Sequence, residues 1–167
     1  MKPWPALVAL GLAAACRDGA APDGTIRVIV TRPQLAPVEL SVPAHARPCF
    51  GEPGRVILGA ADLQGILIWV VTGTGPDTGA FTVNRGVDSV PGRHARVSLR
   101  YLAGDMAHSL ALDSGTVRVR RDGATFAGSL TASGYDATEA GRALVEATLR
   151  GIPLLPDSEP CMGSGTP

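Results

Sequence analysis

The sequence predicts an all-β protein, a single antiparallel β-sandwich with a β-barrel as the alternative, made of about eight or nine short strands. Two observations support this fold class. Short runs rich in β-branched residues alternate between apolar and polar positions, and turn residues separate them. The chain also spreads 14 Pro and 21 Gly over 167 residues, which disfavours a helical bundle. This length suits one domain.

Each expected strand is bounded by turn signals. The first is β-branched and stops before Pro33, whereas 65–72 is apolar on both faces and indicates a strand covered on both sides. Two alternating runs flank Asp122-Gly123, the strongest short-range hairpin signal. The last run keeps a period of two, although Glu139–Glu146 has room for one helical turn. The expected strands are Thr25–Thr31, Val38–Val42, Arg55–Leu58, Gly65–Thr72, Gly79–Asn84, Ala95–Leu102, Gly115–Arg121, Thr125–Ser133 and Arg142–Ile152.

Two stretches are predicted to be loops, and four aromatic residues are predicted to lie in the core. Pro43–Gly54 contains three prolines. Gly73–Gly79 has the spacing GxGxxxG, not that of a dinucleotide loop, and a strand-like run follows it where a phosphate-binding helix would have to begin. The residues expected in the core are Trp69, Phe81, Tyr101 and Phe126.

The N-terminus has the three parts of a secretory signal: Met1-Lys2 with one positive charge, an apolar run over 6–15, and small residues before Cys16. Ten apolar residues are too few to cross a bilayer, which takes about 20. The stretch 12–16 (LAAAC) resembles a bacterial lipoprotein signal, with Ala13 where the family usually has leucine. The resemblance implies cleavage after residue 15 and lipid on Cys16. An ordinary secretory signal, cut after Ala13-x-Ala15, is the alternative.

Three cysteines are present, and an odd number in an exported protein requires an explanation. Lipid on Cys16 leaves Cys49 and Cys161, and an oxidising compartment favours a disulfide between them. Two free thiols or a metal pair are the alternatives, although no CxxC or Cys/His spacing supports a metal. The expected organisation is a signal (1–15), a tether (16–24), a β domain (25–161) and a C-terminal tail (162–167).

The C-terminal half contains a Ser-Gly-Thr-Val strand beginning at Ser114, the Asp122-Gly123 hairpin, the stretch Thr125-Phe126-Ala127-Gly128 and a last strand ending near Gly151. In these motifs it resembles uncharacterised bacterial envelope lipoproteins. The middle motif is shuffled relative to that group, and Leu149 stands where the group has phenylalanine. The resemblance covers about 79–151 and implies a small β-sandwich in the cell envelope. It implies no activity and no catalytic residue.

Charge and motifs exclude several functions. The formal net charge is zero, so nothing predicts a nucleic-acid partner. No GxSxG nucleophile motif occurs, and no catalytic residue, metal or cofactor is predicted. The histidines (His45, His94 and His108) are expected at the surface, and Asp105-x-x-His108 lacks the further ligands that zinc needs. We therefore expect no enzyme, with a hydrolase of unrecognised site as the remaining alternative.

Arginine placement is the one feature that suggests a ligand. Arg96 and Arg100 share one face of their strand, as do Arg118 and Arg120 of theirs, because alternate residues point to the same side. If these strands are neighbours, four guanidiniums form a patch suited to carboxylate or phosphate. A solvated outer face with neighbouring acids is the alternative. Because Lys2 leaves with the signal, every cation of the mature chain is an arginine, 14 against 15 acids.

These observations predict an exported envelope protein, held at a membrane by lipid, on the periplasmic or surface side. The expected role is structural or binding. The alternative is a module that binds an anionic envelope polysaccharide or lipid headgroup through Arg96, Arg100, Arg118 and Arg120.

Overall fold

The structure, a computed structural model, describes residues 24–51, 54–59, 64–73, 77–85, 92–137 and 141–158. Every regular element in these ranges is a β-strand, which confirms the predicted all-β fold class. The strands are β1 (Gly24–Thr31), β2 (Val38–Pro48), β3 (Arg55–Gly59), β4 (Gly65–Val71), β5 (Gly79–Val83), β6 (His94–Ala103), β7 (Met106–Asp122), β8 (Thr125–Asp136) and β9 (Arg142–Pro153).

The nine strands belong to one mixed sheet whose hydrogen bonds run in a closed circle, in the order β1-β2-β3-β4-β6-β5-β7-β8-β9 and back to β1. All neighbours are antiparallel except β5 and β6. Short β5 lies between β6 and the second half of β7, whereas the first half of β7 pairs with β6 directly. One long edge remains in this circle, because β2 pairs over 38–44 with β1 alone, and Pro43 interrupts that edge.

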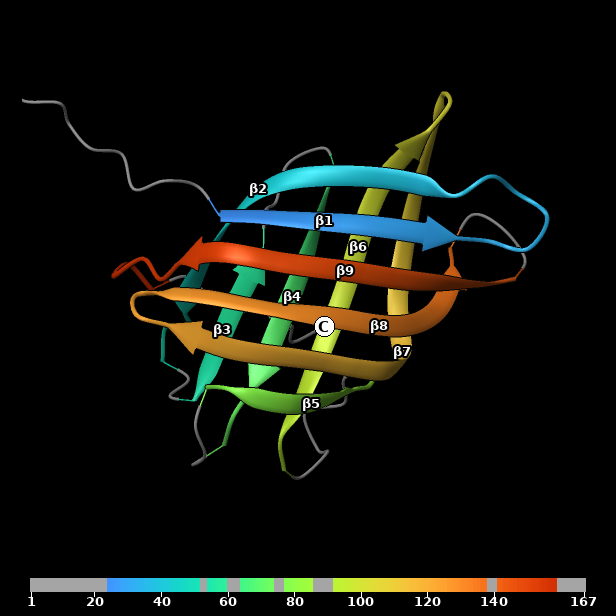
Figure 1. Cartoon of the computed structure of the whole chain (residues 1–167). Helices are drawn as coiled ribbons and strands as arrows, with labels where there is room; N and C mark the ends of the chain where they lie inside the picture. Colours follow the sequence, from blue (N-terminus) through green and yellow to red (C-terminus); the bar gives the residue numbers. More distant parts are fainter. Residues whose placement is uncertain are drawn as a thin grey trace, which may run out of the picture.

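The closed sheet is folded into two walls that pack face to face, as the layers of a sandwich do (Figure 1). The front wall contains β1, β8, β9 and the second half of β7, and the back wall contains β3, β4 and β6. Two long strands turn from one wall into the other. β2 pairs with β1 over 38–44 and with β3 over 45–48, and β7 turns at a bulge between Leu112 and Ser114.

Alternate residues of both walls fill the space between them. Phe81, Tyr101 and Phe126 are at most 1% exposed, which confirms their predicted place in the core. Burying a side chain of this size stabilises a fold by about 1.5–3 kcal/mol. Apolar side chains from every strand join them in one cluster, and its largest members include Ile26, Leu58, Ile66, Ile68, Leu99, Leu110, Leu112, Leu130 and Leu149.

The predicted loop over 43–54 is partly wrong, because β2 continues to Pro48. Each proline of this strand lies where β2 has a partner on one side only. Pro43 lies opposite Thr25 of β1, and Pro48 opposite Val56 of β3. A proline is tolerated there because its missing N–H can face the unpaired side.

Trp69 was predicted in the core, and it lies on the outer side of the back wall instead. Ile68 and Val70 point inward, so the alternation of β4 turns Trp69 outward. There it packs, half-buried, against a second apolar cluster that contains Cys49, Ile57 and Leu67. The expectation that β4 has apolar neighbours on both faces is therefore confirmed, with Trp69 on the outer one.

The closed sheet forms a barrel, and this barrel has two distinct ends. At the entry end the chain enters β1 at Gly24, and the end of β2, the β7–β8 turn and the end of β9 lie beside it. At the far end lie the β1–β2, β6–β7 and β8–β9 connections. In Figure 1 the front-wall strands run from the entry end on the left to the far end on the right.

Candidate anion-binding site

A groove with a volume of about 730 Å³ crosses the outer face of the front wall near the entry end. Three arginines line it: Arg118 and Arg120 on β7, and Arg150 on β9. Strand β8 passes between them and contributes only small residues to the groove. The other small lining residues come from β5, β8 and β9: Gly79, Ala80, Ala127, Gly128, Ser129, Thr148 and Gly151.

Strand alternation points the arginines of β7 out of the barrel. Val117 and Val119 are buried in the core, so Arg118 and Arg120, which alternate with them along the strand, face solvent. Gly128 of β8 lies directly opposite Val119. A Cβ atom at Gly128 would lie 2.0 Å from the carbonyl oxygen of Arg118, so only glycine lets the two strands approach this closely.

A bulge places the third arginine. Phe126 lies opposite Ile152, but Gly128 lies opposite Leu149, so β9 has one residue more than β8 between these pairs. The extra length falls at Arg150-Gly151, where Gly151 takes a φ of 57°, in the left-handed region that favours glycine. Bulges redirect side chains, and this one directs Arg150 to the groove from the opposite side to the arginines of β7.

The three groove arginines have no carboxylate partner within the part of the chain that the structure describes. Among the described residues, Asp122 is the one acidic residue that lines the groove. The neighbouring Arg121 is held by Asp77, with Nη1 3.1 Å from Oδ2. Hydroxyls of Ser129 and Thr148 add hydrogen-bond donors to the floor. The arrangement suits an anion that is gripped by guanidiniums from two sides.

The structure divides the four arginines that the sequence singled out. Arg118 and Arg120 share the groove, whereas Arg96 lies half-buried beside Trp69 and Asn84 on the back wall. Arg100 is exposed on β6, opposite Gly65 and Ser109. β5 separates β6 from the half of β7 that carries Arg118 and Arg120, so the four do not form the single patch expected of neighbouring strands.

Arg150 is the groove residue that the sequence analysis missed. It lies in an alternating strand, as many solvated arginines do, and only the pairing of β9 with β8 shows what it faces. Of the predicted cysteine sites, Cys16 and Cys161 lie outside the described residues. Cys49 is 7% exposed in the outer cluster of the back wall.

The expectation that the histidines lie at the surface is wrong for two of them. His94 is 5% exposed and His108 only 2%, while His45 is half-buried. His108 belongs to the inward series of β7 that continues through Leu110 and Leu112. Its Nδ1 lies 2.8 Å from Oδ2 of Asp136, and its ring stacks on Tyr101 at 4.9 Å between centroids. Side-chain exposures of 2% and 3% keep this pair from bulk solvent.

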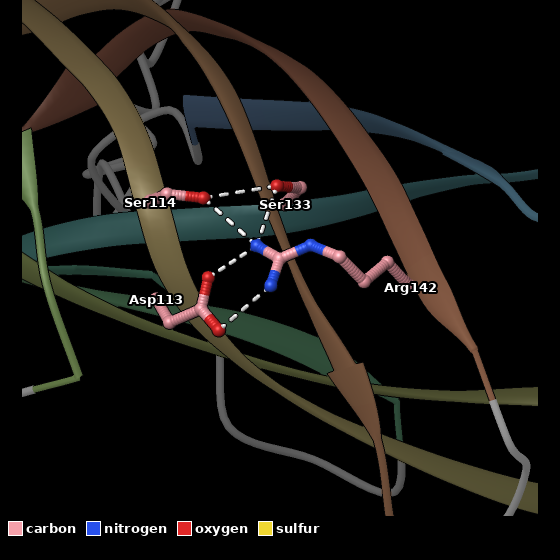
Figure 2. Close-up of polar contacts among 4 residues, drawn as sticks. All are labelled: Asp113, Ser114, Ser133 and Arg142. Carbon is pink, nitrogen blue, oxygen red and sulfur yellow. Dashed lines mark hydrogen bonds and ion pairs between the residues drawn. The ribbon is translucent and has the colours of Figure 1, made fainter.

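A second polar cluster holds the corner of β7. Figure 2 shows Arg142 of β9 reaching across β8 to Asp113, the extra residue of the β7 bulge. Its Nη1 donates to Asp113 at 3.2 Å, and its Nη2 donates to the same carboxylate. Nη2 also donates to the hydroxyl oxygens of Ser114 and Ser133, and both of these distances are 2.9 Å. The guanidinium also lies over the ring of Tyr135. These bonds join three strands where β7 changes walls.

The guanidinium of Arg142 lowers the pKa of Asp113 below its ordinary value, mainly through the hydrogen bond between them. The same bond raises the pKa of Arg142. Both charges already have partners inside the cluster, so we assign this cluster a structural role at the corner and the groove the role of candidate site.

Within the described ranges, no group of three or more His, Cys, Asp or Glu side chains is close enough to hold a metal ion. None of these ranges contains a helix long and apolar enough to span a membrane. Comparison of the chain with protein-family models, curated proteins and solved structures gives no match in any of the three.

Proposed function

We propose that this protein is exported, is anchored to a membrane of the cell envelope by lipid on Cys16, and binds anionic groups without catalysis. The observation that carries the binding proposal is the groove, in which Arg118, Arg120 and Arg150 meet over a floor of small residues without carboxylate partners in the described chain. No aromatic residue of the described ranges lines the groove, so a ligand would be held by its charges and not by stacking of sugar rings.

The envelope location rests on the sequence: the charged start, the apolar run and the small residues before Cys16. A β domain whose sheet closes on itself, with a proline in its one long open edge, fits an exported protein, because such sheets resist edge-to-edge aggregation.

A disulfide between Cys49 and Cys161 is part of this proposal. After β9, Leu154 pairs in parallel with Ala46, and the N–H of Leu155 donates to the carbonyl of Ala46 at 2.9 Å. The C-terminal segment therefore runs beside the end of β2 in the direction of Cys49, which supports the pairing. An oxidising envelope compartment favours the bond.

The test compares two double variants that each remove two positive charges. The groove variant, Arg118→Gln with Arg150→Gln, changes the proposed site, and the back-wall variant, Arg96→Gln with Arg100→Gln, is its matched control. Titration calorimetry would measure binding of two soluble polyanions, polygalacturonate for carboxylate and polyphosphate for phosphate.

We expect the groove variant to bind the preferred polyanion at least about tenfold more weakly than the parent protein, because charge-assisted hydrogen bonds are lost. The back-wall variant should differ from the parent by less than about threefold, the effect of a small change in net charge. Equal losses in both variants, or a parent protein that binds neither polymer, would exclude the groove as an anion site.

A further inference from the structure

The groove lies next to the point where the chain leaves the barrel toward its expected anchor. Thr25, the second residue of β1, pairs directly with Arg150. The arginines of β7 lie two and four residues before the β7–β8 turn, at the same end of the front wall (Figure 1). The groove therefore lies on the front wall close to the entry end of the barrel.

The chain between Cys16 and Gly24 limits how far this end can lie from a membrane. Eight residues, even fully extended, span at most about 29 Å. Lipid on Cys16 would thus keep the entry end within that distance of the headgroups, whatever path the segment takes. The far end is a further 26 Å or so away along β1, because each strand residue advances about 3.3 Å.

Charge and exposure at the entry end match a membrane surface. In the described part of the chain, the groove is lined by Arg118, Arg120 and Arg150 and by one acidic residue, Asp122. Phe50, in the turn after β2, is 73% exposed. β2 passes Ala44, opposite Gly24 at the entry end, and then pairs with β3 as far as Pro48, so this phenylalanine lies beyond the entry end on the side of the back wall. Exposed aromatic residues beside cationic ones are typical of surfaces that rest in the headgroup region.

The far end has more exposed apolar residues, but it lies further along the barrel from the expected anchor at Cys16. Five of the six large exposed apolar or aromatic residues of the described chain lie there: Leu35, Leu102, Met106, Tyr135 and Leu144. To set this end on the membrane, the short segment after Cys16 would have to be almost fully extended along the length of the barrel. The entry end meets the membrane without that constraint.

From these observations we infer that the groove binds headgroup phosphates of anionic lipids in the membrane that anchors Cys16. The inference rests on the proposed function, and it specifies the source of the anion. Arg118 and Arg120 grip a phosphate from one side and Arg150 from the other, while Phe50 contacts the boundary between headgroups and acyl chains. The barrel is thereby oriented with its entry end on the membrane and its far end outward.

The test uses the exported chain with Cys16→Ser, so that attached lipid does not mask weaker binding. Cosedimentation compares vesicles of phosphatidylcholine alone with vesicles that also contain phosphatidylglycerol. The parent should bind only the anionic vesicles. The groove variant (Arg118→Gln, Arg150→Gln) should bind them about 30-fold more weakly, since each cation near an anionic surface contributes about fivefold. The back-wall variant (Arg96→Gln, Arg100→Gln) should stay within about threefold of the parent.

A second measurement tests the orientation with two matched substitutions. Phe50→Trp places a fluorophore at the entry end and Met106→Trp places one at the far end, both at exposed positions. On anionic vesicles the emission of Phe50→Trp should shift to the blue, and that of Met106→Trp should not. A shift of the far-end probe alone would overturn the inferred orientation.

The outcomes separate this inference from the proposed function. Groove-dependent binding of a soluble polyanion, together with vesicle binding that is absent or equal in the two double variants, would overturn the lipid headgroup as ligand and leave anion binding intact. Loss of both groove-dependent effects would overturn both. Groove-dependent vesicle binding with the entry-end shift supports the inference.

Discussion

At the residue scale, Gly128 allows β8 to run close beside β7. The floor of the groove depends on this close approach. A methyl group at this position would meet a backbone oxygen that cannot move without displacing the strand. We predict that Gly128→Ala lowers the free energy of unfolding by about 2–3 kcal/mol. Denaturant titration would measure the change.

Gly123 provides the matched control for this substitution. It has a φ of 58° in the β7–β8 turn, and a Cβ atom there would meet nothing within 4 Å. Asparagine tolerates this conformation better than other residues, so Gly123→Asn should cost less than about 1 kcal/mol. A smaller loss for Gly128→Ala than for Gly123→Asn would contradict the close approach of β8 and β7.

A second residue-scale prediction concerns Asp113 at the corner of β7. Its pKa in the folded protein lies below the ordinary value of 3.8, because Arg142 donates hydrogen bonds to the ionised form. A carboxylate with a lowered folded-state pKa stabilises the fold above its unfolded pKa, and that stabilisation is lost as the pH falls through the folded value. The melting temperature should therefore drop in acid, and Asp113→Asn should reduce the part of the drop that lies below about pH 4.

Glu39 is the comparison for Asp113. Arg27 also lowers the pKa of Glu39, but both side chains of that pair are more than half exposed. Solvent screens exposed pairs, so Glu39→Gln should change the acid dependence less than Asp113→Asn does. Melting curves of both variants at neutral and acidic pH would decide, and a larger effect of Glu39→Gln would contradict the role given to the corner cluster.

His108 shows what a local reading of residues cannot predict. The stretch Asp105-Met-Ala-His108 lacks β-branched residues and follows Gly104, so it suggests a turn. In the structure the turn ends at Asp105, and pairing with β6 makes Met106–His108 part of β7, which carries His108 into the core beside Asp136. The partner carboxylate lies 28 residues further along the chain, and no spacing rule connects the two.

At the scale of elements, alternation located the strands well where local sequence and pairing agree. The Asp122-Gly123 hairpin is confirmed, with Asp122 opposite Thr125 and Gly123 in a positive-φ conformation. Elements that turn corners were predicted too short. β7 starts at Met106, well before the expected Gly115, and β2 continues through two prolines, because a different neighbour pairs with each half of these strands.

The C-terminal segment yields an element-scale prediction about the disulfide. Reduction of the purified protein should add two hydrogens by mass and lower the melting temperature, because the bridge between Cys49 and Cys161 would close a loop of more than a hundred residues. In the chain-entropy model, such a loop stabilises by up to about 4.7 kcal/mol. Cys161→Ser should match the reduced protein in stability. Two free thiols in the unreduced protein would contradict the proposed bridge.

At the scale of the whole molecule, closure of the sheet decides which arginines meet. The faces of Arg96, Arg100, Arg118 and Arg120 were predicted by alternation, since Val97, Leu99, Val117 and Val119 are all buried opposite them. Alternation did not predict which of the arginines lie together, because that depends on the insertion of β5 and on the pairing of β9 with β8. A total charge near zero therefore coexists with a local excess of positive charge in the groove.

The proposed membrane attachment concerns the whole chain and is tested in cells. Replacing Cys16 with serine should move the protein from the membrane fraction to the soluble envelope fraction, or leave a smaller part held by the groove. The groove variant with Cys16 intact should remain in the membrane fraction. Unchanged and complete membrane association of Cys16→Ser would exclude lipid on Cys16 as the anchor.

The most direct test of the central claim observes the arginines themselves. Nuclear magnetic resonance of the side-chain Nε–Hε groups, recorded while glycerol phosphate is added, reports which guanidiniums contact the anion. We predict that Arg118, Arg120 and Arg150 shift together along one binding curve while Arg96 and Arg100 stay unchanged. Equal shifts at all five arginines, or shifts confined to Arg96 and Arg100, would contradict the assignment of the groove as the anion site.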